Sequence, residues 1–139
     1  TPEDCEPDTV IYTGTHDNDT AVGWFHGGPS EESTEHEERH RRLREAAARY
    51  LGGNGSDVHR RMIEVAWRSR ANWAIVPMQD VLGLGREARM NVPGVATGNW
   101  RWRLRTPDLS AADWSWLREL CARYDRAPPE GTTPAPDFV

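Results

Sequence analysis

The sequence of 139 residues contains no lysine, and all seventeen of its basic residues are arginine. We interpret this as a codon bias of the source rather than as chemistry. Acidic residues are in excess, with a formal net charge of -5 at pH 7. A negative surface repels phosphate backbones, so no nucleic-acid partner is expected. No apolar run of about 18 residues is present, so neither a transmembrane helix nor a membrane partner is expected.

Cysteine is also scarce. Cys5 and Cys121 lack the CxxC spacing that is typical of metal sites and redox motifs. Two lone thiols are typical of a reducing compartment, and the basic-then-apolar N-terminus of a signal peptide is missing. We therefore predict a cytoplasmic protein that binds no metal and no cofactor. Because the sequence begins at Thr1 rather than at Met, we expect it to be a piece of a longer protein.

Two short apolar runs, residues 9–13 and 73–78, are predicted to be strands buried on both faces. Between them we predict a charged helix over 31–51 and a second, well-buried helix that is capped by Ser56 or Asp57 and ends near residue 70. Strand, helices, strand is the order of a parallel crossover unit, which indicates an α/β fold. Two parallel strands cannot form a stable sheet alone, so the sequence favours a larger parallel-sheet protein.

The rest of the sequence predicts a long loop, a last helix and a tail. Residues 79–107 are rich in Gly, Pro and Asn, but their Trp, Leu and Met side chains favour an ordered loop. A capping box of Ser110 with Asp113 predicts a helix over 110–124. Residues 127–139 are rich in proline and are predicted to be disordered. The predicted inner face of the last helix consists of Trp114, Leu117, Cys121 and Tyr124.

Polar residues follow both predicted strands where each strand ends. The run His16-Asp-Asn-Asp19 comes after the first strand, and Gln79-Asp80 comes after the second. Chemistry in parallel α/β folds is found at the C-terminal ends of strands. Such a cluster is costly to desolvate unless every group has a partner, so it is either a ligand site or a fully hydrogen-bonded turn. The pattern favours the ligand site and leaves the polar turn open.

Three sharper motifs fail on their spacing. A calcium loop that starts at Asp17 would need an oxygen ligand and a glycine where Ala21 and Val22 stand. The His16-Asp17 pair could be the His-Asp dyad of a metal-dependent phosphohydrolase. Such dyads lie on helices among other metal-ligand histidines, whereas this pair follows a strand. The GxGxxA run at 83–88 is followed by Asn, Pro and Gly residues that break the helix a dinucleotide site requires. We reject all three interpretations.

Several longer motifs together resemble the C-terminal part of the 4-alpha-glucanotransferases, the amylomaltases or disproportionating enzymes of glycoside hydrolase family 77. The resemblance spans roughly residues 10–124 in the order of the family. Its motifs are YTGTHDNDT at 12–20, GWF at 23–25, AIVPMQD at 74–80, LGLG at 82–85, ARMN at 88–91, PG at 93–94 and GNWRWR at 98–103.

The resemblance implies a (β/α)8 TIM barrel with inserted subdomains. It places residues 10–13 at barrel strand 7 and 74–78 at strand 8. Residues 1–126 would form the C-terminal segment of the barrel, with residues 30–53 as a charged helical insertion after strand 7. The remainder of the barrel, from the parent chain, is the implied protein partner.

The resemblance further implies retaining transfer of α-1,4-glucan segments between maltooligosaccharides. Asp17 matches the carboxylate that stabilises the transition state, and His16 matches a partner of sugar hydroxyls. Asn18, Gln79 and Asn91 are implied substrate contacts. The nucleophile and the acid/base belong to strands that this sequence lacks. A stand-alone, non-catalytic carbohydrate-binding or structural module derived from such an enzyme is the alternative hypothesis.

Overall fold

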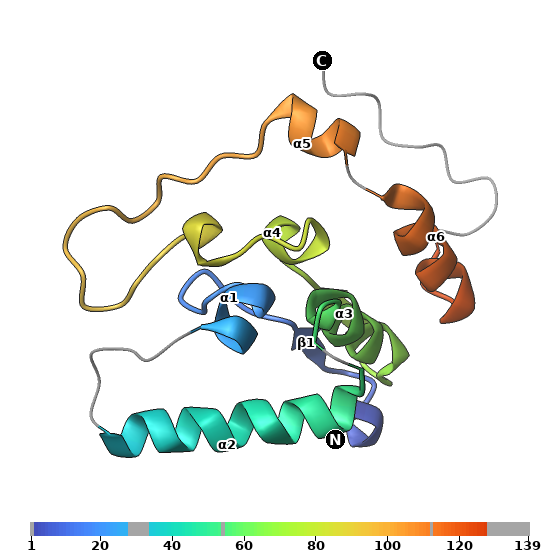
Figure 1. Ribbon diagram of the computed structural model, residues 1–139. Helices are drawn as coiled ribbons and strands as arrows, with labels where there is room; N and C mark the ends of the chain where they lie inside the picture. Colours follow the sequence, from blue (N-terminus) through green and yellow to red (C-terminus); the bar gives the residue numbers. More distant parts are fainter. Residues whose placement is uncertain (1, 28–33, 54, 112, 128–139) are drawn as a thin grey trace.

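The computed structural model describes residues 2–27, 34–53, 55–111 and 113–127. Their elements in chain order are the 3-10 helix η1 (Pro2–Asp4), β1 (Val10–Tyr12), α1 (Ala21–His26), α2 (Thr34–Leu51), α3 (Val58–Arg68), β2 (Trp73–Ile75), α4 (Met78–Val81), the 3-10 helix η2 (Arg86–Ala88), α5 (Thr106–Ala111) and α6 (Trp114–Arg123). Helix α3 lies between α2 and α6, and a long irregular segment leads from η2 to α5 (Figure 1).

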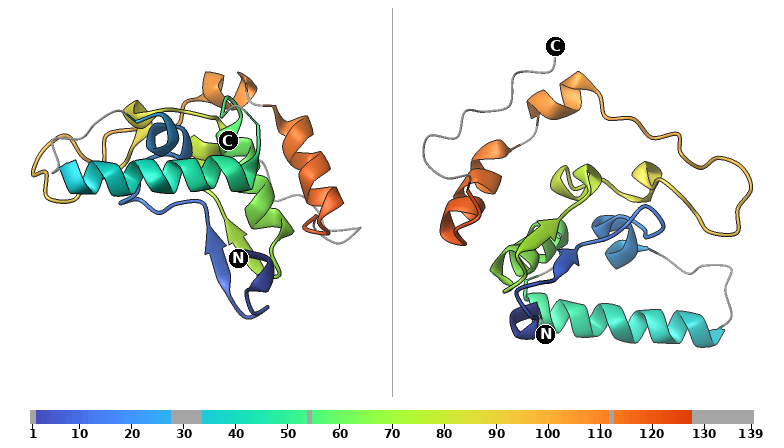
Figure 2. Two further views of the ribbon diagram at one scale, coloured as in Figure 1. Left: turned by 60° about the horizontal axis from the view of Figure 1, so that its bottom comes forward. Right: turned by 180° about the vertical axis from the view of Figure 1, so that it is seen from behind.

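Strands β1 and β2 pair in parallel, with Val10 opposite Trp73 and Tyr12 opposite Ile75. They are drawn side by side in the left view of Figure 2. The chain passes through α1, α2 and α3 between the two strands, so the predicted parallel crossover is confirmed. Within the described ranges these two strands are the whole sheet.

The prediction that both strands are buried on both faces is wrong for this chain. Val10 is 44% exposed and Tyr12 is 50% exposed, and Trp73 and Ile75 on β2 are exposed as well. Helix α3 packs near the strands, but a sheet of two strands offers no second layer to cover its other face. Alternating side chains on a strand point to opposite faces, so the uncovered face exposes every second residue.

Helix α3 supplies the centre of the core. Its residues Val58, Ile63 and Ala66 are buried, which confirms the predicted buried helix. Asp57 occupies the N-cap position, yet its side chain makes no cap hydrogen bond. The carboxylate instead accepts a hydrogen bond from Arg61 Nε at 2.9 Å, one helical turn further on.

The predicted charged helix is present as α2, and residues 30–33 of the predicted insertion lie outside the described residues. Its apolar face is largely uncovered, since Leu43 is 48% exposed and Tyr50 is 47% exposed. Tyr50 donates its hydroxyl to Glu3 at 2.9 Å, which connects the end of α2 to the N-terminal segment. An amphipathic helix normally buries its apolar face, so the exposed face of α2 is a surface that further structure would be expected to cover.

The single last helix predicted over 110–124 is two helices, α5 and α6. Ser110 lies inside α5 and donates to the Thr106 carbonyl, so it does not form the predicted capping box. Asp113 itself is the N-cap of α6 and accepts a hydrogen bond from Trp116 N at 3.3 Å. Leu120, rather than Trp114, is the buried residue of α6. The predicted disordered tail falls on residues that, from 128 onward, lie outside the described part of the chain.

Candidate functional site

The cluster of polar residues after β1 forms a tight turn, which we call the site turn (residues 13–20). Asn18 Oδ1 accepts hydrogen bonds from Thr15 N at 2.8 Å and from Thr15 Oγ1 at 2.9 Å. Asn side chains that bind a nearby backbone N–H in this way stabilise turns. The carbonyl oxygen of Asn18, a predicted substrate contact, therefore holds the turn in shape.

Helix α1 follows the site turn directly and was not predicted from the sequence. Thr20 is its N-cap, and the Thr20 hydroxyl accepts a hydrogen bond from Gly23 N at 3.0 Å. A threonine before a run of apolar residues is the signal that would have found this helix. The site turn is thus confined between a strand and a capped helix.

The structure brings His16, Asp17 and Asn91 together. Asn91 Nδ2 donates to Asp17 Oδ1 at 2.6 Å, and Asn91 N donates to the His16 carbonyl at 3.1 Å. The His16 Nε2 atom lies 3.3 Å from Asp17 Oδ1. The side chains of His16 and Asp17 remain 57% and 51% exposed, so both are accessible to a ligand.

Arg89 is a site residue that the sequence did not single out. Its Nη2 donates to the Asp17 carbonyl at 2.7 Å, and its Nε donates to the Asn91 carbonyl at 2.8 Å. Trp100 completes this side of the site, with its ring centroid 5.2 Å from that of His16. These contacts place residues 89–100 of the loop predicted over 79–107 at the same end of the strands as Asp17.

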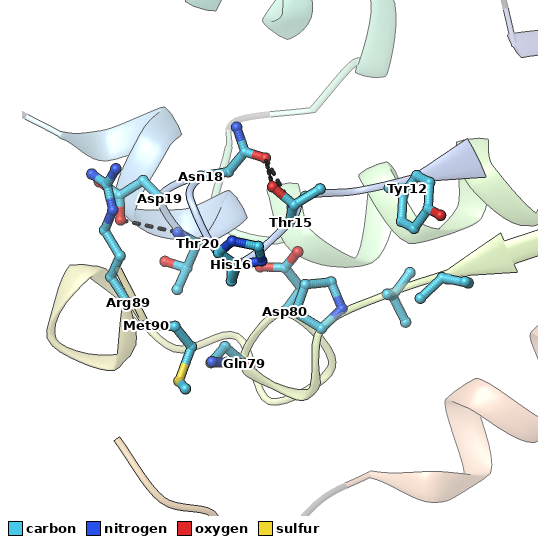
Figure 3. A pocket seen from close by; sticks show the side chains of 14 residues that line it. Tyr12, Thr15, His16, Asn18, Asp19, Thr20, Gln79, Asp80, Arg89 and Met90 are labelled. Carbon is cyan, nitrogen blue, oxygen red and sulfur yellow. Dashed lines mark hydrogen bonds between the residues drawn. The ribbon is translucent and has the colours of Figure 1, made fainter. Parts of the chain in front are cut away.

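A pocket of about 390 Å³ opens beside this cluster. His16, Asn18 and Gln79 line it (Figure 3). Asp17 and Asn91 are outside its lining, although both contact His16. Gln79 is 8% exposed, and its Nε2 donates to the Ala88 carbonyl at 3.2 Å. The remaining lining residues are Tyr12, Gly14, Thr15, Asp19, Thr20, Ile75, Val76, Pro77, Asp80, Arg89 and Met90.

The other two carboxylates near the site turn are engaged in the fold. Asp19 accepts a hydrogen bond from Arg86 Nε at 2.8 Å, and its side chain is only 7% exposed. Asp80 is 1% exposed and accepts hydrogen bonds from Thr13 and Ala21. The turn therefore contains hydrogen-bonded polar groups, as the polar-turn interpretation expects, beside an exposed His16-Asp17 pair. That the pair binds a ligand stays a prediction.

In the part of the chain that the structure describes, no group of three or more His, Cys, Asp or Glu side chains is placed to hold a metal ion. Among the same residues, no helix has the length and apolar character needed to cross a membrane.

Comparison with known proteins identifies the family. The family profile described as 4-alpha-glucanotransferase matches residues 1–110. The chain belongs to this family. The resemblance seen in the sequence motifs is thereby confirmed.

Relatives in the family are similar to most of this chain. The chloroplastic/amyloplastic 4-alpha-glucanotransferase of Solanum tuberosum is 40% identical over 129 residues, which cover 90% of this chain and 20% of that protein. The Thermus thermophilus 4-alpha-glucanotransferase is 42% identical over 124 residues, covering 84% of this chain and 22% of that protein. The chain therefore spans about a fifth of the length of the curated relatives it matches.

A solved structure agrees with this assignment. The amylomaltase from Streptococcus agalactiae in complex with acarbose superposes with a TM-score of 0.71 at 27% sequence identity. The match covers 91% of this chain and 24% of that chain. The chain is thus an α/β segment similar to part of an amylomaltase.

Replacing Gly23 by Ala is expected to destabilise α1, although alanine usually favours a helix by about 1 kcal/mol over glycine. A Cβ atom at this position would overlap Asp19 Oδ1 and lie 2.9 Å from Thr20 Oγ1. Both atoms belong to the site turn and its cap. We expect a lower thermal midpoint of the longer protein that contains this chain. Gly14→Ala is the control, because a Cβ there meets its nearest atom at 3.5 Å. Equal midpoints for the two variants would contradict the prediction.

Stability around α3 is expected to fall as the pH falls below about 7. Burial lowers the pKa of His59 from its ordinary value of 6.5, and Arg60 acts in the same direction, whereas Asp80 and Asp57 oppose the shift. The unfolded state therefore binds the proton first, so acidification from above 6.5 toward the lowered pKa favours unfolding.

Amide hydrogen exchange of α3, corrected for intrinsic rates, measures this effect between pH 7.5 and 5.5. In the described residues His59 Nδ1 is buried without a hydrogen-bond partner, so His59→Phe removes the titration without removing a bond at that atom. We expect this variant to lose the pH dependence, and the exposed His40→Gln control to keep it. A His59→Phe variant with the wild-type pH dependence would show that another group is responsible.

Proposed function

We propose that this chain is the C-terminal part of a 4-alpha-glucanotransferase that transfers α-1,4-glucan segments between maltooligosaccharides by a retaining double displacement. The observation that carries the proposal is the family match over residues 1–110 together with Asp17, which is exposed and hydrogen-bonded to Asn91 at the C-terminal ends of the strands. In barrels of this class, the C-terminal strand ends bear the active site.

In the proposed mechanism, Asp17 accepts hydrogen bonds from hydroxyls of the sugar at which the bond is cleaved. Hydrogen bonds to a charged acceptor are roughly twice as strong as neutral ones. They strengthen as positive charge develops on the ring in the oxocarbenium-like transition state. Asn91 and His16, both at Asp17 Oδ1, orient the carboxylate, and His16 also lines the pocket as a sugar-hydroxyl partner.

Gln79, Asn18 and Asn91 are the further substrate contacts of the proposal. Gln79 and Asn18 line the pocket. Asn91 is outside its lining and donates a hydrogen bond to the Asp17 carboxylate. The amylomaltase of Streptococcus agalactiae that this chain resembles is in complex with acarbose, which supports an oligosaccharide as the occupant.

The remainder of the barrel is the proposed partner of this chain. Retaining transfer needs a nucleophile and an acid/base whose carboxyl groups lie about 5 Å apart. We assign both to the parent protein outside residues 1–139, and we assign β1 and β2 to barrel strands 7 and 8. The exposed Val10, Tyr12 and Trp73 support this assignment, because neighbouring strands and helices of a barrel would cover them.

The alternative function is a stand-alone carbohydrate-binding or structural module. The two hypotheses differ in what the gene encodes upstream of Thr1. An in-frame continuation with a strand-ending Asp and a strand-ending Glu, and glucose release from maltotriose by the encoded protein, supports the transferase. A start codon close to Thr1 would overturn it in favour of the module. A cytoplasmic location remains a prediction, since the Solanum tuberosum relative is named chloroplastic/amyloplastic.

A further inference from the structure

The Asp80 carboxylate accepts hydrogen bonds from Thr13, the first residue of the site turn, and from Ala21, the residue that follows the turn. Thr13 Oγ1, at the end of β1, donates to Asp80 Oδ2 at 2.7 Å. Ala21 N, the first residue of α1, donates to Asp80 Oδ1 at 2.7 Å. Asp80 comes from α4, immediately after β2, and lies with His16, Thr15 and Thr20 around the pocket (Figure 3).

These contacts fix the separation of the two points from which the site turn projects. Thr13 marks where the chain leaves the sheet, and Ala21 marks where it enters α1. The Ala21 N–H has no partner within its own helix, because the first N–H groups of a helix never do. Asp80 satisfies it from outside, while Thr20 satisfies Gly23 N within the helix.

The burial of Asp80 makes both hydrogen bonds consequential. Its 1% exposure leaves little water to replace a lost partner. When a buried polar group loses its hydrogen-bond partner, the folded state is destabilised by the cost of desolvating that group. This cost is larger when the group is charged. The turn is therefore expected to shift, rather than stay in place, when either donor is removed.

We propose that Asp80 is a positioning residue of the transferase: it sets the location of the Asp17 carboxylate by hydrogen-bonding Thr13 and Ala21. The inference rests on the proposed function of Asp17. Arg86 and Arg89 lie a few residues further along the same loop and bind Asp19 and the Asp17 carbonyl. The segment from Asp80 to Asn91 thus holds the site turn at its two ends and along its length.

The test compares two threonines that flank the same strand. Thr13→Val in the longer protein removes the hydroxyl that binds Asp80 and keeps the shape of the side chain. Thr9→Val is the matched control, because Thr9 Oγ1 donates to the Glu6 carbonyl at 2.6 Å at the other end of β1. Kinetics with maltotriose are measured well below the thermal midpoint of every variant, so that loss of folded protein does not enter.

We expect Thr13→Val to lower kcat roughly ten- to a hundredfold, because small misplacements of a catalytic group cost rates of this order. KM should change by less than about twofold, since the interaction concerned is made in the transition state. Thr9→Val should leave both constants near their wild-type values. A Thr13→Val enzyme with the kcat of Thr9→Val would overturn the proposal.

Substitutions of Asp80 itself separate positioning from charge. In Asp80→Asn, the amide oxygen still accepts from Ala21 N, and the amide nitrogen can donate to Thr13 Oγ1, since a hydroxyl can accept as well as donate. Asp80→Asn is therefore expected to retain most of kcat, whereas Asp80→Ala loses it or fails to fold. If Asp80→Asn is as inactive as folded Asp17→Asn, the positioning role is wrong.

Failure of this inference is distinguishable from failure of the proposed function. Loss of activity in Asp17→Asn with normal activity in Thr13→Val would overturn the role of Asp80 alone. Full activity in Asp17→Asn would overturn the proposed function of Asp17, and with it the inference.

Discussion

Replacing Asp17 by Asn in the longer protein is expected to lower kcat for maltotriose disproportionation on the order of 10²-fold or more, with a much smaller effect on substrate binding. The Asp17 carboxylate is half exposed and is oriented by Asn91, so an amide of the same shape can occupy its place. What the amide lacks is the negative charge that strengthens hydrogen bonds as the sugar ring becomes positive.

The chain offers a matched control for this substitution at the opposite end of the strands. Asp8 Oδ1 accepts a hydrogen bond from Asn72 Nδ2 at 3.1 Å, so the fold contains a similar exposed Asp–Asn pair near the start of β1 and β2. Asp8→Asn should leave kcat near its wild-type value, because the N-terminal strand ends contribute to stability rather than to chemistry. Disproportionation by Asp17→Asn within about twofold of wild type would show that the assigned role is wrong.

The isolated chain is expected to release no glucose from maltotriose. Of the three aspartates around the site, Asp17 is the exposed one, since Asp19 is bound to Arg86 and Asp80 is buried. Asp17 and Asp19 also lie on one turn and cannot flank a glycosidic bond from opposite faces. Retaining transfer needs one carboxylate to attack and another to protonate, and we assign both to the parent protein outside this chain. Glucose release by the purified chain would contradict this prediction.

The isolated chain is also expected to lack a sharp thermal transition. Two paired strands leave an unpaired edge on each side, and Val10, Tyr12, Trp73 and Ile75 expose the apolar face of the sheet. The core around Ile63 on α3 is small compared with these uncovered surfaces. We expect a broad transition in circular dichroism. A cooperative transition of the monomer would instead favour the stand-alone module.

Part of this result follows from local sequence. Apolar runs of strand length separated by helix-period segments predicted the parallel crossover, and β1, α3 and β2 confirm it. The motifs around His16 and Gln79 carried the family resemblance, which the profile match confirms. Short-range periodicity is sufficient for the crossover, because strand and helix patterns are repeated within a few residues, whereas the family rests on the matching motifs.

Local signals were weaker where one side chain changes the path of the chain. Helix α1 depends on the cap at Thr20, and the break between α5 and α6 depends on Asp113 as an N-cap. The sequence pattern predicted no helix over the first segment and a single helix over the second. Side chains that hydrogen-bond the backbone compete with the helical pattern, so one or two such bonds decide where a helix begins or ends.

The sequence by itself determined the family, the crossover and the presence of a polar cluster at the strand ends. Only the tertiary structure decided which side chains of that cluster contact one another and which are buried. It joins Asn91 to Asp17 across 74 residues of sequence, and it buries Asp80 against Thr13 across 67. No local periodicity encodes such pairs, because they exist only when β1 and β2 lie in register and the 79–103 loop folds back over their ends. The same packing left Asp17 exposed and buried Asp80, although both are aspartates that follow a strand.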